Sequence, residues 1–171
     1  MANTYWLSVN TLKEESTLDS NIEDKLIKSS IIDGQEIDIQ SILGTRLFNK
    51  ISTDIDGATV SGVYKTLLDN YITPALIKFS ERRALLYIWI KIRNKSVISE
   101  GSEYGNTVDM EMFNMVRRDL LDSAEYFSNR LKLYLIEEVD NYPEYKNWNS
   151  DTKCYNVKPN KNDSFFCGIQ L

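Results

Sequence analysis

The sequence of 171 residues has no histidine, only three prolines and two cysteines. Without histidine the chain lacks the commonest metal ligand, the usual general base near neutral pH and every histidine-containing catalytic triad. No phosphate-binding loop is present, because the stretch around Gly101 and Gly105 has the wrong spacing and no following Lys-Ser/Thr pair. The adjacent carboxylates Glu137 and Glu138 would point about 100° apart on a helix, which is typical of a solvated face. We therefore expect no enzyme and no cofactor or metal.

Long hydrophobic runs are also missing. The longest unbroken apolar stretch, Ala84–Ile90, is far shorter than the ~20 residues of a membrane span, and Arg83 and Lys91 flank it. The first residues carry no basic region followed by an apolar segment, so no signal or transit peptide is expected. Cys154 and Cys167 are expected to be free thiols of a protein made in the cytoplasm, without contact to a membrane.

What the chain does contain is enough apolar material for one domain: 42% of its residues are hydrophobic and 11% aromatic. A chain of this size can bury roughly two-thirds of its unfolded surface. At the N-terminus, Tyr5, Leu7 and Val9 alternate with other residues, which predicts a short strand or an extended arm over residues 1–19.

The next two segments have helical periodicity. Ser20 and Glu23 are spaced as a capping box, which predicts a first helix from about 21 to about 35. After Gly34 and Asp38 a second helix is expected to end before residue 54. Its apolar positions follow helical spacing: Ile42, Leu43, Leu47, Phe48 and Ile51.

The third segment, about 61–95, contains a proline within a helical pattern. Pro74 predicts either a kink or a restart of the helix with Thr73 as N-cap. From Ala75 to about Ile92 the pattern is apolar on more than one face. Such a helix is expected at the centre of a bundle or shared between subunits.

The fourth segment, about 107–139, has the strongest periodicity. Residues 61–100 hold seven Lys/Arg and three Asp/Glu (7 − 3 = +4), while residues 101–140 hold four and nine (4 − 9 = −5). Complementary charge predicts that the third and fourth helices pack antiparallel, with the charges setting register more than stability. The expected buried face is Val108, Met112, Val116, Leu120, Ala124, Phe127, Leu131 and Leu135.

The tail, residues 142–171, loses the helical period and reads as a β-hairpin or an extended arm. Its apolar side chains would be costly to leave in water, so the arm is expected to dock on a partner. The candidate interaction residues in this arm are Tyr155, Val157, Phe165, Phe166, Ile169 and Leu171.

Three further candidate interaction residues lie in the third helix. Arg82 and Arg83 could pair with carboxylates of a neighbouring subunit or lie at the rim of the bundle. Trp89 ends an aromatic series whose spacing is more typical of core packing than of a ligand site. Three methionines are expected to fill gaps in the core, with an adaptable partner groove as the alternative: Met110, Met112 and Met115.

In their order along residues 20–145, several motifs resemble the head-tail connector proteins of tailed bacteriophages, particularly those of crAss-like phages. The motifs are Leu43-Gly44 at a helix junction, Tyr64 to Leu76 with Pro74, Asn94-Lys95, and Tyr134-Leu135 followed by Tyr142-Pro143-Glu144-Tyr145. This chain has Ser96 where related sequences often continue Asn-Lys-Gly.

The resemblance implies a structural virion protein that forms a ring, expected to be dodecameric, beneath the portal. Such a ring would bind the portal and further tail or ring proteins at the portal vertex, and DNA would pass through it without sequence-specific binding. The net charge of −5 agrees with a channel wall that does not retain DNA.

The expected fold is all-α: a small helical bundle with a long antiparallel helix pair, plus extended or β-hairpin terminal arms. Its expected divisions are an N-terminal arm (1–19), a helical connector domain (20–141) and a C-terminal arm (142–171). The alternatives are a non-viral helical dimerisation or interaction module and, less favoured, an enzyme that uses carboxylates alone.

Overall fold

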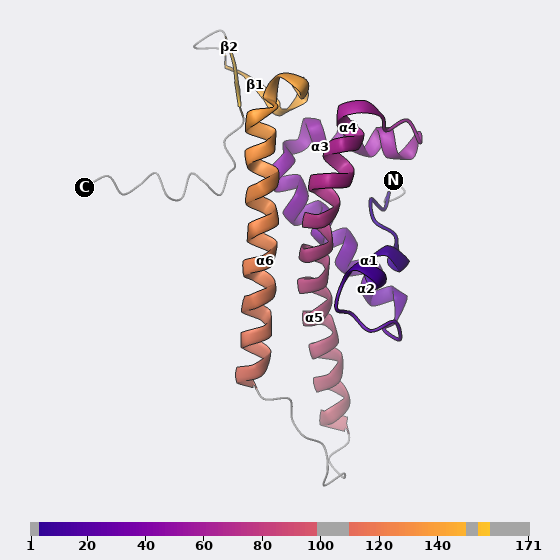
Figure 1. Ribbon diagram of the computed structural model, residues 1–171. Coiled ribbons are helices and arrows are strands. Elements are labelled where there is room, and N and C mark those ends of the chain that lie inside the picture. The colour runs from indigo at the N-terminus through magenta and orange to yellow at the C-terminus, as the bar shows by residue number, and fades with distance from the viewer. Residues whose placement is uncertain (1–3, 99–109, 150–153, 158–171) are drawn as a thin grey trace, which may run out of the picture.

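The computed structural model of the protein describes residues 4–98, 110–149 and 154–157 (Figure 1). The fold is all-α, as the sequence predicts. Its larger elements are α1 (Val9–Glu15), α2 (Asp24–Asp33), the π-helical η1 (Gly34–Ile39), α3 (Gln40–Asp56), α4 (Gly62–Leu67), the π-helical η2 (Leu68–Ile72), α5 (Thr73–Ile98) and α6 (Met110–Glu137). After α6 come the 3₁₀ turns η3 (Val139–Asn141) and η4 (Pro143–Tyr145) and the strands β1 (Lys146–Asn149) and β2 (Cys154–Val157).

Helix α5 is the centre of the bundle. It runs beside α6 in the opposite direction, and α2 with η1 covers another of its sides (Figure 1). Ala75, Leu76 and Ala84 are at most 1% exposed, and both neighbours approach because these positions include small side chains. The predicted antiparallel pair and the central position of this multi-faced helix are confirmed.

The main core lies around α5, with α2, α3 and η1 on one side and the second half of α6 on another. Each fully buried leucine or isoleucine stabilises the fold by about 1.5–3 kcal/mol relative to an exposed one. The largest side chains below 2% exposure are Tyr142, Leu12, Ile27, Ile31, Ile39, Leu43, Leu47, Ile51, Leu67, Ile72, Leu76 and Leu131.

The N-terminal segment is part of this core, so the expected strand or extended arm is wrong for its described residues. Ser8 caps α1 by accepting a hydrogen bond from the amide of Thr11 (3.0 Å), and Leu12 is fully buried. Trp6 stacks on Phe48 of α3 at 4.7 Å between ring centroids. The alternation of apolar residues misled because Tyr5 is 42% exposed, Leu7 is buried and Val9 already belongs to α1.

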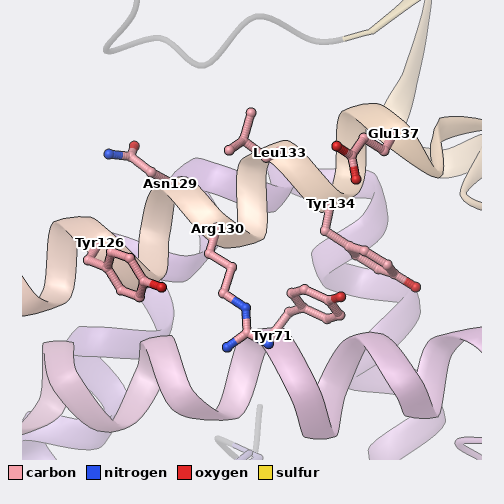
Figure 2. Close-up of a pocket in the computed structure, with 7 residues that line it drawn as sticks. All are labelled: Tyr71, Tyr126, Asn129, Arg130, Leu133, Tyr134 and Glu137. Carbon is pink, nitrogen blue, oxygen red and sulfur yellow. The ribbon is translucent and has the colours of Figure 1, made fainter.

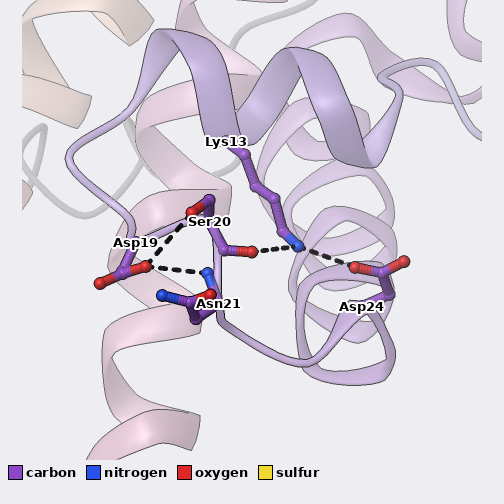
Figure 3. A network of polar contacts seen from close by, with 5 residues as sticks. All are labelled: Lys13, Asp19, Ser20, Asn21 and Asp24. Atoms are coloured by element: carbon purple, nitrogen blue, oxygen red, sulfur yellow. Dashed lines mark hydrogen bonds and ion pairs between the residues drawn. The ribbon is translucent and has the colours of Figure 1, made fainter.

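The expected capping box at Ser20 and Glu23 is not formed, and α2 begins at Asp24. Asp19 instead accepts the amide hydrogen of Asn21 at 2.8 Å, which holds the loop in a turn (Figure 3). Lys13 of α1 donates to the carbonyl of Ser20 at 2.9 Å and to the carboxylate of Asp24 at 2.8 Å. The loop is therefore fixed by a tertiary contact that local spacing does not reveal.

The break between the first two predicted helices lies at Gly44 rather than at Gly34. Gly34 has helical dihedrals (φ −61°, ψ −42°) and is buried against α5, where an added Cβ would lie 3.0 Å from Ser80 Oγ. Gly44 has φ 72° and ψ 160°, and α3 kinks there. The Leu43-Gly44 junction is therefore a real change of direction.

The chain passes Pro74 without the expected restart. Thr73 is itself helical (φ −58°, ψ −49°) and donates its backbone N–H to the carbonyl of Leu68, five residues back. Because proline has no N–H to give, a π-helical turn just before it widens the spiral while keeping the axis continuous. Thr73 is not an N-cap, and the irregularity before Pro74 is a π-helical turn.

The predicted inner face of α6 is correct only in its second half. Ala124, Leu131 and Leu135 are fully buried, and Leu120 and Phe127 are half-buried. Near the start of the helix Phe113 takes the inner position by stacking on Trp89 (centroids 4.2 Å apart). The methionines there do not fill core gaps as expected: Met112 is 60% exposed and Met115 68%.

Strands β1 and β2 pair antiparallel, with Lys146 opposite Val157 and Asn149 opposite Cys154. The candidate residues Phe165, Phe166, Ile169 and Leu171 lie outside the described residues.

A buried carboxylate joins the N-terminal segment to α5. Glu81 has no exposed side-chain surface and accepts hydrogen bonds from the amide and hydroxyl of Thr17 (2.9 and 2.5 Å) and from Lys78 (2.9 Å). Burial alone would raise the pKa of Glu81, but these donors outweigh it and lower the pKa below its ordinary value.

We expect Gly44→Ala to destabilise the fold by about 1–3 kcal/mol, because a Cβ is strained at this positive φ. Chemical denaturation measures the loss. Gly57→Ala is the matched control, since Gly57 has φ −81° and its added Cβ would meet only ordinary contacts at 3.4 Å or more. Equal effects of the two substitutions would contradict the kink at Gly44.

We expect Glu81→Gln to cost about 1–3 kcal/mol at pH 7, because charged hydrogen bonds to a buried group are lost. The folded-state pKa is lowered, so this stabilisation is complete above the ordinary glutamate pKa of about 4.3 and disappears as pH falls through the lowered pKa. Stability measured between pH 7 and 3 should therefore fall less steeply in the variant. Glu14→Gln, at an exposed position of α1, should leave both the stability and its pH dependence unchanged.

Candidate functional site

A surface groove of about 510 Å³ lies where η2 meets the second half of α6 (Figure 2). Tyr71 comes from η2 and the other lining residues from α6. The π-helical turn before Pro74 sets the position of Tyr71, so the irregular backbone directly shapes the groove. The lining consists of Tyr71, Tyr126, Asn129, Arg130, Leu133, Tyr134 and Glu137.

The floor of the groove is a stacked pair of tyrosines. The rings of Tyr71 and Tyr134 are nearly parallel, with centroids 3.8 Å apart and 12° between their planes. The guanidinium of Arg130 lies over the Tyr71 ring at 5.0 Å, in cation–π geometry. The stack and the cation together fix a flat aromatic surface with a positive group above it.

Buried hydrogen bonds hold this floor from behind. Tyr142 is fully buried, donates its hydroxyl hydrogen to the carbonyl of Val63 (3.0 Å) and lies 3.2 Å from the hydroxyl of Tyr134. Burial, followed by the hydrogen bond with Tyr134, raises the pKa of Tyr142 well above its ordinary value. Tyr64 donates to Glu144 at 2.8 Å, and burial together with this bond raises the pKa of Tyr64 to about 12. Both phenols therefore stay neutral and act as donors at physiological pH.

The groove combines a positive group with apolar surface. Among the described residues Arg130 forms no ion pair, so its guanidinium is free to meet a carboxylate while its stem and Leu133 offer apolar contact. The described part of the chain holds no cluster of three metal-ligating side chains. Within that part, no helix combines the length and apolar character of a membrane span. The arrangement can hold a peptide or a neighbouring helix.

The arginines of the third predicted helix are occupied within the chain. Arg83 Nε donates to Asp38 at 2.7 Å, and Arg82 lies 3.6 Å from the same carboxylate. Burial would lower the pKa of Arg83, but Asp38 raises it on balance, so the guanidinium stays charged. Asp38 lies in η1, so these arginines join η1 to α5.

Among the candidates that the structure describes, Trp89 lies away from the groove. Trp89 is half-buried against Phe113, at the opposite end of α6 from the groove. Tyr155 and Val157 lie in β2, opposite Trp148 and Lys146 of β1.

Sequence reasoning missed the groove residues on α6. Tyr126 and Leu133 do not fit the buried 3–4 series, and they are 65% and 60% exposed. The signal that could have found them is the presence of large apolar side chains outside the main 3–4 repeat of a long helix. A second apolar series on a helix predicts a second face that another element or a partner covers.

These features define a helical-bundle protein with a tyrosine-lined surface groove. Residues 39–155 match the model of a family of unknown function, DUF6712, and the chain belongs to this family. The matched range includes every residue that lines the groove. Neither the curated proteins nor the solved structures contain a match to the chain.

If Tyr142 anchors the groove floor, Tyr142→Phe should destabilise the protein by about 1–2 kcal/mol, because the carbonyl of Val63 loses its buried donor. Tyr126→Phe makes the same change at a 65% exposed ring and should have no measurable effect. Thermal unfolding of the two variants gives the comparison. Equal midpoints for Tyr142→Phe and the unmodified protein would show that the hydrogen bond contributes nothing.

Proposed function

We propose that the chain is a structural virion protein of a tailed bacteriophage that forms a ring under the portal and joins capsid to tail. The expected ring is a dodecamer that binds the portal and further tail or ring proteins and continues the DNA channel. In this proposal the protein is not an enzyme, and it is located at the portal vertex after assembly in the host cytoplasm.

The observation that carries the proposal is the outer face of α6. This long helix covers α5 with its inner face, yet its outer face keeps several large apolar side chains in solvent, among them Met115, Tyr126 and Leu133. Exposed apolar side chains arranged along a whole helix are typical of a surface that another subunit covers. The groove at Arg130 lies on this face, and the net charge of −5 suits a channel that releases DNA.

Tyr142 and Tyr145 are buried in the core, so the proposed attachment to the portal or to a neighbouring ring is the part of the C-terminal arm, residues 142–171, that follows them. Its apolar residues Phe165, Phe166 and Ile169 would supply side-chain anchors, and strand addition at a sheet edge would supply backbone hydrogen bonds. The proposed form of the arm is a β-hairpin built on β1 and β2 or an extended segment beyond them.

The second candidate function is a non-viral helical interaction module. The same outer face of α6 favours it, because a helix with exposed apolar residues also suits a regulator that pairs with one partner. Size separates the two candidates: a connector assembles into a ring on the portal, whereas a module of this kind stays a small oligomer. An enzyme based on carboxylates alone is the least supported, since Glu81, the buried carboxylate described above, is fully occupied by Thr17 and Lys78.

The test is electron microscopy of the protein mixed with its portal. We expect rings on the portal and no rings of the protein alone, because the portal supplies the template. A triple substitution to alanine at Phe165, Phe166 and Ile169 should abolish decoration, whereas a triple alanine variant at the polar Asn160, Lys161 and Asn162 should not. Undecorated portals with the unmodified protein would refute the connector role, and full decoration by the first variant would refute only the role of the arm.

A further inference from the structure

The outer face of α6 carries an uninterrupted heptad series. Its eight positions follow intervals of three and four residues, the spacing of a coiled-coil seam, and all eight are exposed. They extend over about 36 Å of helix. The series is Met112, Met115, Asp119, Asp122, Tyr126, Asn129, Leu133 and Ile136.

The chemistry of this outer seam is uneven along its length. Both ends are apolar, with Met112 and Met115 at one end and Leu133 and Ile136 at the other, each more than half exposed. The middle is polar: two carboxylates come first, followed by a tyrosine and an asparagine. A partner that covers the whole seam must therefore match four successive parts of it, which are apolar, acidic, hydrogen-bonding and apolar.

A second copy of α6 in antiparallel orientation supplies that order. Two residues would then face each other across the seam when their numbers add up to 248. Each such pair joins an a position of the heptad (Met112 and every seventh residue after it) with a d position (Met115 and every seventh residue after it), as antiparallel coiled coils require. Four kinds of layer would each occur twice: Met112 with Ile136, Met115 with Leu133, Asp119 with Asn129, and Asp122 with Tyr126. Each apolar residue meets an apolar one, and each carboxylate meets a side chain that can donate a hydrogen bond.

A parallel pair would do the opposite. It would place Asp119 opposite Asp119 and Asp122 opposite Asp122, so that four carboxylates would come together in the middle of the seam. Like charges in direct opposition across an interface cost several kcal/mol. Charge complementarity thus selects both the occupant and its direction.

The charged residues beside the seam affect the stability of the antiparallel pair. In the antiparallel pair Arg130, which has no ion pair among the described residues, would lie next to Asp119 of the other copy. On the other flank Arg118 would lie near Lys132, and Glu125 near Glu125, both with like charge. These flanks are exposed, so salt screens their repulsion, and the pair should be weak at low salt and tighter at moderate salt.

We propose that the free protein forms an antiparallel dimer through the outer seam of α6. The dimer is a property of the protein alone, and it does not depend on the connector role or on any phage partner. Two identical grooves would be covered in it, since Tyr126, Asn129 and Leu133 both line the groove and lie in the seam.

Sedimentation of the full-length protein over a range of concentrations up to about 0.5 mM tests the dimer. We expect a reversible increase to twice the monomer mass. Asn129→Asp should weaken dimerisation at least about tenfold, because it places two carboxylates in one layer. Asn114→Asp is the matched control: it makes the same change at an exposed position of α6 outside the seam and should leave dimerisation unchanged.

The double variant Asp119→Asn with Asn129→Asp should recover dimerisation, because it restores one carboxylate and one amide to the layer while keeping the net charge. A monomer at every concentration would overturn the proposal. So would an Asn129→Asp variant that dimerises normally, or a double variant that does not recover.

Cross-linking tests the direction. In a background with Cys154→Ser and Cys167→Ser, Met115→Cys and Leu133→Cys are made in separate chains, one with a size tag. The antiparallel pair should give disulfide-linked dimers only when the two variants are mixed, since two copies of position 115 would lie about 27 Å apart. Cross-linking of each variant to itself would show a parallel pair, and no cross-linking in the mixture would show that the seam is not the interface.

Discussion

The structure depends on the burial of α5 on several sides. A helix with apolar and small residues around most of its circumference has to be covered by more than one neighbour, so α6 packs along one side and α2 with η1 along another. The charged residues of α5 follow the same constraint, because Glu81 has to be satisfied by Thr17 and Lys78, while Arg82 and Arg83 share Asp38. These polar contacts fix the short N-terminal elements, whose own hydrophobic surface is small.

Irregular backbone lets the short elements follow this central helix. The π-helical turns η1 and η2 and the positive φ of Gly44 change direction without long loops. The turn η1 contains Gly34, which packs closely on Ser80, and η2 precedes Pro74, which has no N–H. The turn at η2 also places Tyr71 on Tyr134, so the adjustment around Pro74 becomes one wall of the groove. The π-helical turn before Pro74 thus shapes both the fold and the groove.

Helix α6 divides its residues between two tasks. Ala124, Leu131 and Leu135 stabilise the bundle from the inner face, whereas the heptad series on the outer face is exposed in a single chain. Apolar side chains that do not serve the core are the most direct evidence for partners in a chain without histidine or metal-binding clusters in its described part. Both the proposed ring and the proposed dimer rest on this surplus.

The sequence alone determined the all-α class, the antiparallel pair of long helices and the central place of α5, because strong periodicity and opposite net charge are local properties that packing preserves. The family resemblance named Leu43-Gly44 as a junction, and the structure has Gly44 at φ 72°, which only glycine readily adopts. Only the tertiary structure decided that Trp6 and Leu12 join the core, that Lys13 rather than a capping box holds the start of α2, and that Arg82 and Arg83 pair with Asp38. The groove and the outer seam belong to this second group: which of two apolar series on α6 is buried depends on where α5 lies, and that contact is made between residues distant in the chain.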